Sequence, residues 1–164
     1  MSKTRKLTTM AITVAIAMTL SYIDRIITSL APLPPGIKLG LANIAVVFAL
    51  YKLGTKEAAI ISVLRVALTA MLFGSMVSFW YAIAGATVSL ILMILLKKFT
   101  PLSCVTVSTV GGISHNIAQI CVASLLFDTN LLIYYLPFLL VAGVVAGIVI
   151  GTASALLVKR IKIK

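Results

Sequence analysis

Residues 131–158 read LLIYYLPFLLVAGVVAGIVIGTASALLV and contain no charged side chain. A helix needs about 20 mainly apolar residues to cross the hydrocarbon core of a bilayer, and this run is long enough. Five further apolar runs precede it, at approximately 7–30, 39–53, 58–73, 76–96 and 101–127. Proline and glycine between the runs favour helix ends there. The sequence therefore predicts an all-α, polytopic membrane bundle of six transmembrane helices, formed as a single domain over residues 1–164.

The composition excludes several other classes of protein. Of the 164 residues, 62% are hydrophobic and 10% are charged, whereas about 25% of the residues in an average soluble domain are charged. The mean hydropathy is +1.21. We therefore exclude a soluble globular protein, a nucleic-acid-binding domain and a disordered tail, and we expect the surface of the protein to contact membrane lipid.

Most of the basic residues lie at every second boundary between the apolar runs. Eleven of the fourteen are Lys3, Arg5, Lys6, Lys52, Lys56, Lys97, Lys98, Lys159, Arg160, Lys162 and Lys164. Cytoplasmic loops carry an excess of Lys and Arg, so this pattern places both termini in the cytoplasm.

The runs 39–53 and 58–73 are short for a span. They could extend into loops, be shielded by other helices, or include a re-entrant segment. The alternation of basic clusters favours full crossings.

Ionisable side chains inside a membrane are costly and invite a functional hypothesis. Four stand out, Asp24, Arg25, Arg65 and His115. In one interpretation Asp24 pairs with Arg25 or Arg65 and fixes helix packing. In the other, which we favour, Arg65 faces a cavity and holds an anionic or polar ligand, because residues 60–73 contain no acid to neutralise it.

A polar cluster occupies the fifth run. His115 and Gln119 lie four residues apart and therefore on one helix face, with Asn116 beside them and two glycines one turn earlier. Such residues can form hydrogen bonds between helices or line a pocket, and the clustering with glycines favours a pocket wall. One histidine without a second ligand at suitable spacing does not predict a metal site, and we expect no cofactor.

Small residues form two stripes. Gly143, Gly147 and Gly151 recur every four residues, which allows two helices to approach closely and predicts internal packing. Ala11 and Ala15 recur in the same way on the first helix. They either pack internally or present a flat face to another membrane protein.

Enzyme motifs are absent from the sequence. Chemistry on prenyl diphosphates uses clustered carboxylates to hold Mg²⁺, but the three acids lie at positions 24, 57 and 128. The chain also has no phosphate-binding loop for ATP. We therefore expect a protein that is not an enzyme, and active transport would require separate ATPases.

Several segments resemble one bacterial family of six-helix membrane proteins. They are PPGIKLGLANI (34–44), LR (64–65), FGS (73–75), LLKK (95–98), SHNIAQ (114–119) and YLP (135–137). The family carries two labels, "heptaprenyl diphosphate synthase component I" and "Gx transporter". It is similar in turn to the substrate-binding S-components of energy-coupling factor (ECF) transporters, whose first helix docks on a coupling subunit through an Ala-x-x-x-Ala motif that Ala11 and Ala15 match.

The resemblance implies an S-component-like subunit that takes up a small, anionic or vitamin-like molecule. The ligand would enter beneath residues 31–38, and ATPases would drive the coupling subunit. The alternative is a non-catalytic membrane subunit in prenyl-quinone synthesis or a membrane redox assembly. The aromatic pair Trp80 and Tyr81 either stacks on a ring of the ligand or anchors the protein at the membrane interface. The expected substrate-binding residues are Arg65, His115, Asn116, Gln119, Asp24, Lys38, Asn43, Trp80 and Tyr81.

Overall fold

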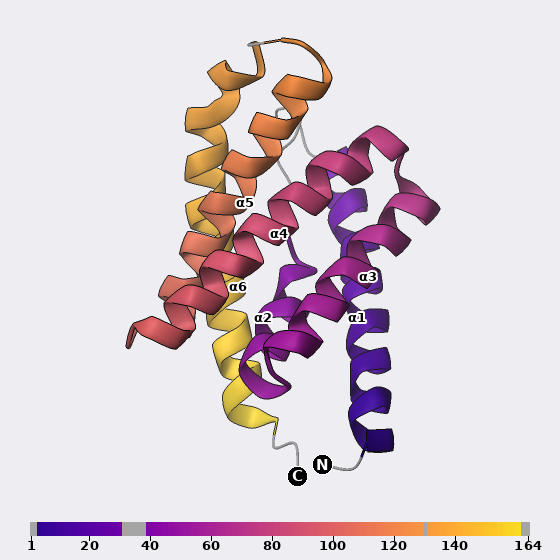
Figure 1. Ribbon diagram of the computed structural model, residues 1–164, viewed down its shortest axis with the longest axis vertical. Coiled ribbons are helices and arrows are strands. Elements are labelled where there is room, and N and C mark those ends of the chain that lie inside the picture. The colour runs from indigo at the N-terminus through magenta and orange to yellow at the C-terminus, as the bar shows by residue number, and fades with distance from the viewer. Residues whose placement is uncertain (1–2, 31–38, 130, 162–164) are drawn as a thin grey trace.

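The computed structural model describes residues 3–30, 39–129 and 131–161, and the regular elements in these ranges are all helices (Figure 1). They are α1 (Lys3–Leu30), α2 (Asn43–Lys52), α3 (Thr55–Phe73), α4 (Met76–Phe99), α5 (Cys104–Leu126), the 3-10 helix η1 (Leu131–Tyr135) and α6 (Leu136–Arg160). Helices α1, α4 and α5 and the segment Leu131–Arg160 are long and apolar enough to cross a membrane. The expected all-helical membrane architecture is confirmed at this level.

The helices form two groups. Helices α1, α2 and α3 pack on one another, and α5 packs between α4 and α6. Contacts of α3 with α4 and of α2 with α6 join the groups. In Figure 1, α4 runs diagonally across the bundle, and the start of α1 and the end of α6 lie together at its lower end. Because successive helices reverse direction, the α3–α4 and α5–η1 connections lie at the opposite end.

Helix α2 is shorter than the sequence predicts. Its ten residues span about 15 Å, half the thickness of a hydrocarbon core. Gly40 has a φ of +71°, and Asn43 N donates to Gly40 O at 2.8 Å, so a turn replaces the first part of the expected helix. Residues 45–50 are all buried. The other helices therefore shield α2, which is too short to cross the membrane as a helix by itself. Helix α3 begins at Thr55, three residues before the expected run.

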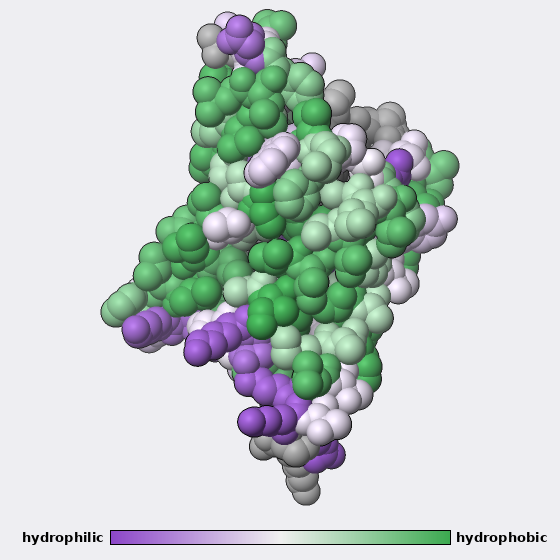
Figure 2. Space-filling model, turned by 45° about the vertical axis from the view of Figure 1, so that its right-hand side comes forward, coloured by the Kyte–Doolittle hydropathy of each residue, from purple (hydrophilic) through white to green (hydrophobic). Residues whose placement is uncertain are grey.

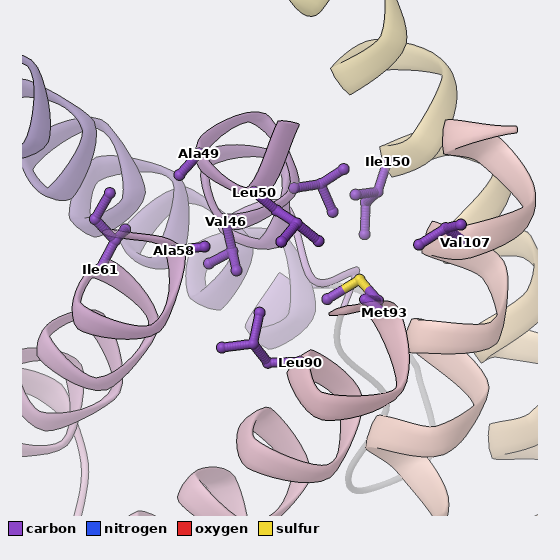
Figure 3. Close-up of a cluster of buried hydrophobic side chains, with 10 residues drawn as sticks. Val46, Ala49, Leu50, Ala58, Ile61, Leu90, Met93, Val107 and Ile150 are labelled. Carbon is purple, nitrogen blue, oxygen red and sulfur yellow. The ribbon is translucent and has the colours of Figure 1, made fainter. Parts of the chain in front are cut away.

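The largest group of buried apolar side chains surrounds α2. Figure 3 shows Val46 and Leu50 facing Met93 of α4, Val107 of α5 and Ile150 of α6. Lys97 of α4 donates from Nζ to the backbone oxygen of Leu50 at 2.6 Å, near the end of α2. This cluster lies on the side of the bundle nearer the start of α1 and the end of α6.

Close approach of α5 and α6 depends on glycine. A Cβ atom at Gly147 would lie 2.5 Å from the Cα of Thr109, and one at Gly112 would lie 2.5 Å from the backbone oxygen of Gly143. The predicted internal packing of the α6 glycine stripe is confirmed.

The surface has a broad apolar band. Figure 2 shows this band across the middle of the molecule and hydrophilic residues gathered at the lower end. Helices α2, α4 and α6 each finish with basic residues in their last turn, at Lys52, Lys97 and Lys98, and Lys159 and Arg160. We call this the basic end of the bundle.

Candidate functional site

A cavity of about 520 Å³ lies between the two groups of helices. Its walls come from the second halves of α1 and α3, the first half of α4, the middle turns of α5 and α6, and the residues around the start of α2. It therefore lies away from the basic end. Its volume is within the range of about 300–1,000 Å³ that is usual for small-molecule sites.

Most of the expected binding residues line this cavity. They are Asp24, Asn43, Arg65, Tyr81, His115, Asn116 and Gln119, which come from five helices. Trp80 does not line it: the side chain is 54% exposed, and its ring packs edge to face on Phe79 with ring centroids 5.5 Å apart. That position suits an interfacial anchor. Lys38 and the rest of residues 31–38 lie outside the described residues.

Asp24 is buried in the cavity wall and has backbone partners. Its Oδ1 accepts from Leu39 N at 2.9 Å, and its Oδ2 accepts from Gly40 N at 2.8 Å. Within the described ranges, no nitrogen of Arg25 or Arg65 lies within 4.0 Å of this carboxylate. The interpretation that Asp24 forms an ion pair with one of them is therefore corrected. The two N–H groups lie in a turn before α2, where no helical acceptor is available to them.

Arg65 has no such partner for its Nε atom. That atom is buried and has no hydrogen bond. Asp24 exerts Coulombic attraction on the guanidinium, but among the described residues no acid lies within ion-pair distance of it. Burying a charge is costly unless it is paired and hydrogen-bonded. An anion in the cavity would supply what the protein does not.

The polar residues of α5 both pack against neighbouring helices and line the cavity. Asn116 donates from Nδ2 to the backbone oxygen of Leu139 at 2.6 Å and so joins α5 to α6. Gly85 of α4 leaves room for His115, because a Cβ there would lie 2.9 Å from the His115 backbone oxygen and 3.0 Å from its ring. The sequence predicts that this polar cluster either forms hydrogen bonds between helices or lines a pocket. Asn116 does both, since it bonds to α6 and also lines the cavity.

The sequence contained a signal for further lining residues. Ser21, Asp24 and Thr28 follow the i, i+3, i+7 spacing of one helix face, and all three line the cavity. Thr69 lies one turn after Arg65 and lines it as well. A search for hydroxyl residues in register with the two charged ones would have found them.

The alanine stripe of α1 lies on the surface. Ala11 and Ala15 are both exposed, and neighbouring Leu7, Ile12 and Ile16 are 67%, 56% and 51% exposed. No described part of the chain packs over this face. Internal packing of the alanine stripe, one of the two expected uses, therefore does not occur within the described residues.

Comparison with known proteins identifies one family. The sequence profile of a family described as heptaprenyl diphosphate synthase component I matches residues 13–157. No curated protein and no solved structure matches the chain.

Proposed function

The chain belongs to the heptaprenyl diphosphate synthase component I family, and on this premise we propose that it is a non-catalytic membrane subunit that binds a small molecule. The observation that carries the proposal is the cavity around Arg65, whose buried Nε lacks a hydrogen bond. A family described as one component implies a second component. The proposed assembly therefore contains a separate prenyl-synthesising protein.

The positions of the acids support a non-catalytic role. The chain has three acids in all. Asp24 accepts two backbone hydrogen bonds, Glu57 pairs with Lys6 at the basic end, and Asp128 is exposed after α5. Mg²⁺-dependent diphosphate chemistry needs carboxylates that meet at one site. In this proposal the partner supplies them.

The proposed orientation follows from the basic end. If this end faces the bacterial cytoplasm, as the excess of Lys and Arg favours, the cavity lies in the outer half of the inner membrane. A cytoplasmic synthase would then meet the basic end of the bundle, and the ligand would reach the cavity from the other side.

One observation favours a second candidate function, uptake of the ligand. The cavity lies away from the basic end, and the apolar cluster around α2 lies between the two. A ligand that enters from the outer side would therefore be held there without an open path to the cytoplasmic side, as uptake requires. In this candidate the protein is an S-component-like subunit of an ECF transporter. The exposed face of Ala11 and Ala15 would dock on a coupling subunit driven by ATPases.

Affinity purification from native membranes separates the candidates. The tagged wild-type protein is compared with an Ala11→Leu/Ala15→Leu variant, and a Val141→Leu/Val145→Leu variant is the control because those α6 side chains are 66% and 57% exposed. The main proposal predicts that mass spectrometry finds a prenyl synthase with all three proteins. Recovery of ATPases and a helical membrane protein, lost only in the alanine variant, would replace it with the uptake function. Recovery of neither would contradict both partnerships.

A further inference from the structure

The residues at the start of α2 form part of the cavity wall. Ala42 and Asn43 line it, and Ala42, the residue that precedes the helix, makes no side-chain hydrogen bond to the first turn. The backbone dipoles of a helix place partial positive charge at this end. The N–H groups of Asn43 and Ile44 bond to Gly40 and Leu41, so the contribution of α2 is mainly its field.

Arg65 adds a full positive charge to the cavity wall. It lines the same cavity, and its buried Nε has no hydrogen-bond partner. Asp24 is the one acid that lines the cavity among the described residues, and both of its oxygens accept backbone N–H groups. The charged side chains in the described lining are thus two arginines, Arg25 and Arg65, against one carboxylate, which leaves one positive charge unmatched.

The one unmatched positive charge of the described lining suits a ligand with a single negative charge. A single carboxylate would neutralise it, and the planar guanidinium suits carboxylate geometry. A diphosphate brings more negative charge than the described lining balances. Its usual Mg²⁺ counter-ion is held by carboxylates together with the phosphates, and both oxygens of Asp24, the one acid in the described lining, already accept backbone N–H groups.

The remainder of the cavity suits a less polar group. Val66 and Phe73 of α3, Tyr81 and Ala82 of α4, and Ile150 of α6 line it. An aromatic ring packs favourably on the faces or edges of rings such as those of Phe73 and Tyr81. The cavity therefore combines one anion site with an apolar and aromatic wall.

We infer that the cavity binds a small monocarboxylate, with the carboxylate between Arg65 and the start of α2 and an apolar or aromatic body against Phe73 and Tyr81. This inference rests on the proposed small-molecule function and names its ligand class. It also distinguishes the ligand of this subunit from the diphosphate in the family's name.

The test is retention of ligand by the purified, full-length protein in detergent. Wild type, Arg65→Gln and Arg160→Gln are incubated with an extract of the host cells and their growth medium, then washed and denatured. The retained molecules are identified by mass spectrometry. Arg160 is the matched control because it is an exposed arginine at the end of α6, far from the cavity lining. Thermal unfolding verifies that each variant is folded.

We expect the wild type and Arg160→Gln to retain a molecule with one carboxylate. Retention by Arg65→Gln should fall about tenfold or more, because charge-assisted hydrogen bonds are lost. In the wild type, sodium acetate should displace the molecule, whereas sodium phosphate and sodium pyrophosphate at equal ionic strength should not. This competition requires no variant and remains decisive if Arg65→Gln fails to fold.

Each contrary result has a separate meaning. A retained molecule that is uncharged, or that phosphate or pyrophosphate displaces better than acetate, overturns the inferred ligand class and leaves the proposed function intact. Equal retention by a folded Arg65→Gln variant overturns the carboxylate site at Arg65. A wild-type protein that retains nothing overturns the small-molecule function itself.

Discussion

Asp24 joins α1 to the turn before α2 through two charge-assisted hydrogen bonds from Leu39 and Gly40. Asp24→Ala would leave two backbone N–H groups without their acceptor, which costs about 1–3 kcal/mol each when the groups are buried. We expect the variant to unfold at a lower temperature in detergent and Asp24→Asn to lose less, because an amide oxygen still accepts. Asp128→Asn, a change at an exposed acid, is the control. An unchanged midpoint for Asp24→Ala would contradict the assigned role.

Glu57 binds Lys6 and so ties the start of α3 to the start of α1. The hydrogen bond from Lys6 is the main reason that the pKa of Glu57 lies below its ordinary value of 4.5. A carboxyl whose folded pKa is depressed stabilises the protein above the unfolded pKa, and this stability is lost as the pH falls through the folded value.

Stability should therefore decrease below about pH 4.5 more in the wild type than in Glu57→Gln. The difference should be under about 1 kcal/mol, because Lys6 is 41% exposed and exposed pairs contribute little. Thermal unfolding of both proteins between pH 3 and 7 measures it. Parallel curves for the two proteins would show that the pair does not contribute.

Helices α5 and α6 touch through backbone atoms, so their contact is sensitive to a single methyl group. Gly147→Ala would place a Cβ 2.5 Å from the Cα of Thr109, which cannot move without shifting the helix. We expect a loss of about 1–3 kcal/mol, the usual cost of overpacking. Val145→Ile adds one carbon on the exposed face of the same helix and should have no effect. Thermal unfolding of both variants tests this, and equal stability would contradict the close contact.

Helix α2 shows what local patterns cannot reveal. Residues 39–53 are mainly apolar, which is typical both of a membrane span and of a helix buried by protein. Helix α2 begins after the left-handed Gly40 and ends before the left-handed Gly54, whose N–H bonds to Ala49 O at 3.0 Å. The residues that bury α2 come from other helices, and Lys97, which bonds to Leu50, is 47 residues away in the chain. The burial of α2 by protein is therefore a tertiary property.

The two ends of the bundle should lie on opposite sides of the membrane. In a background with Cys104 and Cys121 changed to Ser, single cysteines are introduced at Asp128, at Ser75 on the cavity wall, and at Lys159 on the basic end. A membrane-impermeant maleimide should label the first two in intact cells and the third after permeabilisation, because basic residues face the cytoplasm. The cysteine-free parent is the control. Labelling of the Lys159→Cys protein in intact cells would reverse the proposed orientation.

The candidate site could be predicted in part because membrane burial makes charged groups rare and costly. That cost alone indicated Arg65 and Asp24, and helical spacing indicated His115 and Gln119 on one face. The partners of these groups could not be predicted. Whether Asp24 meets a guanidinium or a backbone N–H depends on how residues 39 and 40 fold against α1, and whether Trp80 faces the cavity depends on the rotation of α4.

The sequence by itself determined that this is a helical membrane bundle with one basic end. A backbone in lipid must satisfy its hydrogen bonds within the helix, and charged residues avoid the hydrocarbon core, so both properties can be recognised in short segments. Only the tertiary structure decided that α2 is a short buried helix, that Asp24 holds a turn, and that Arg65 borders a cavity without an ion pair among the described residues. These features depend on contacts between residues far apart in the chain, and such contacts leave no periodic signal in the sequence.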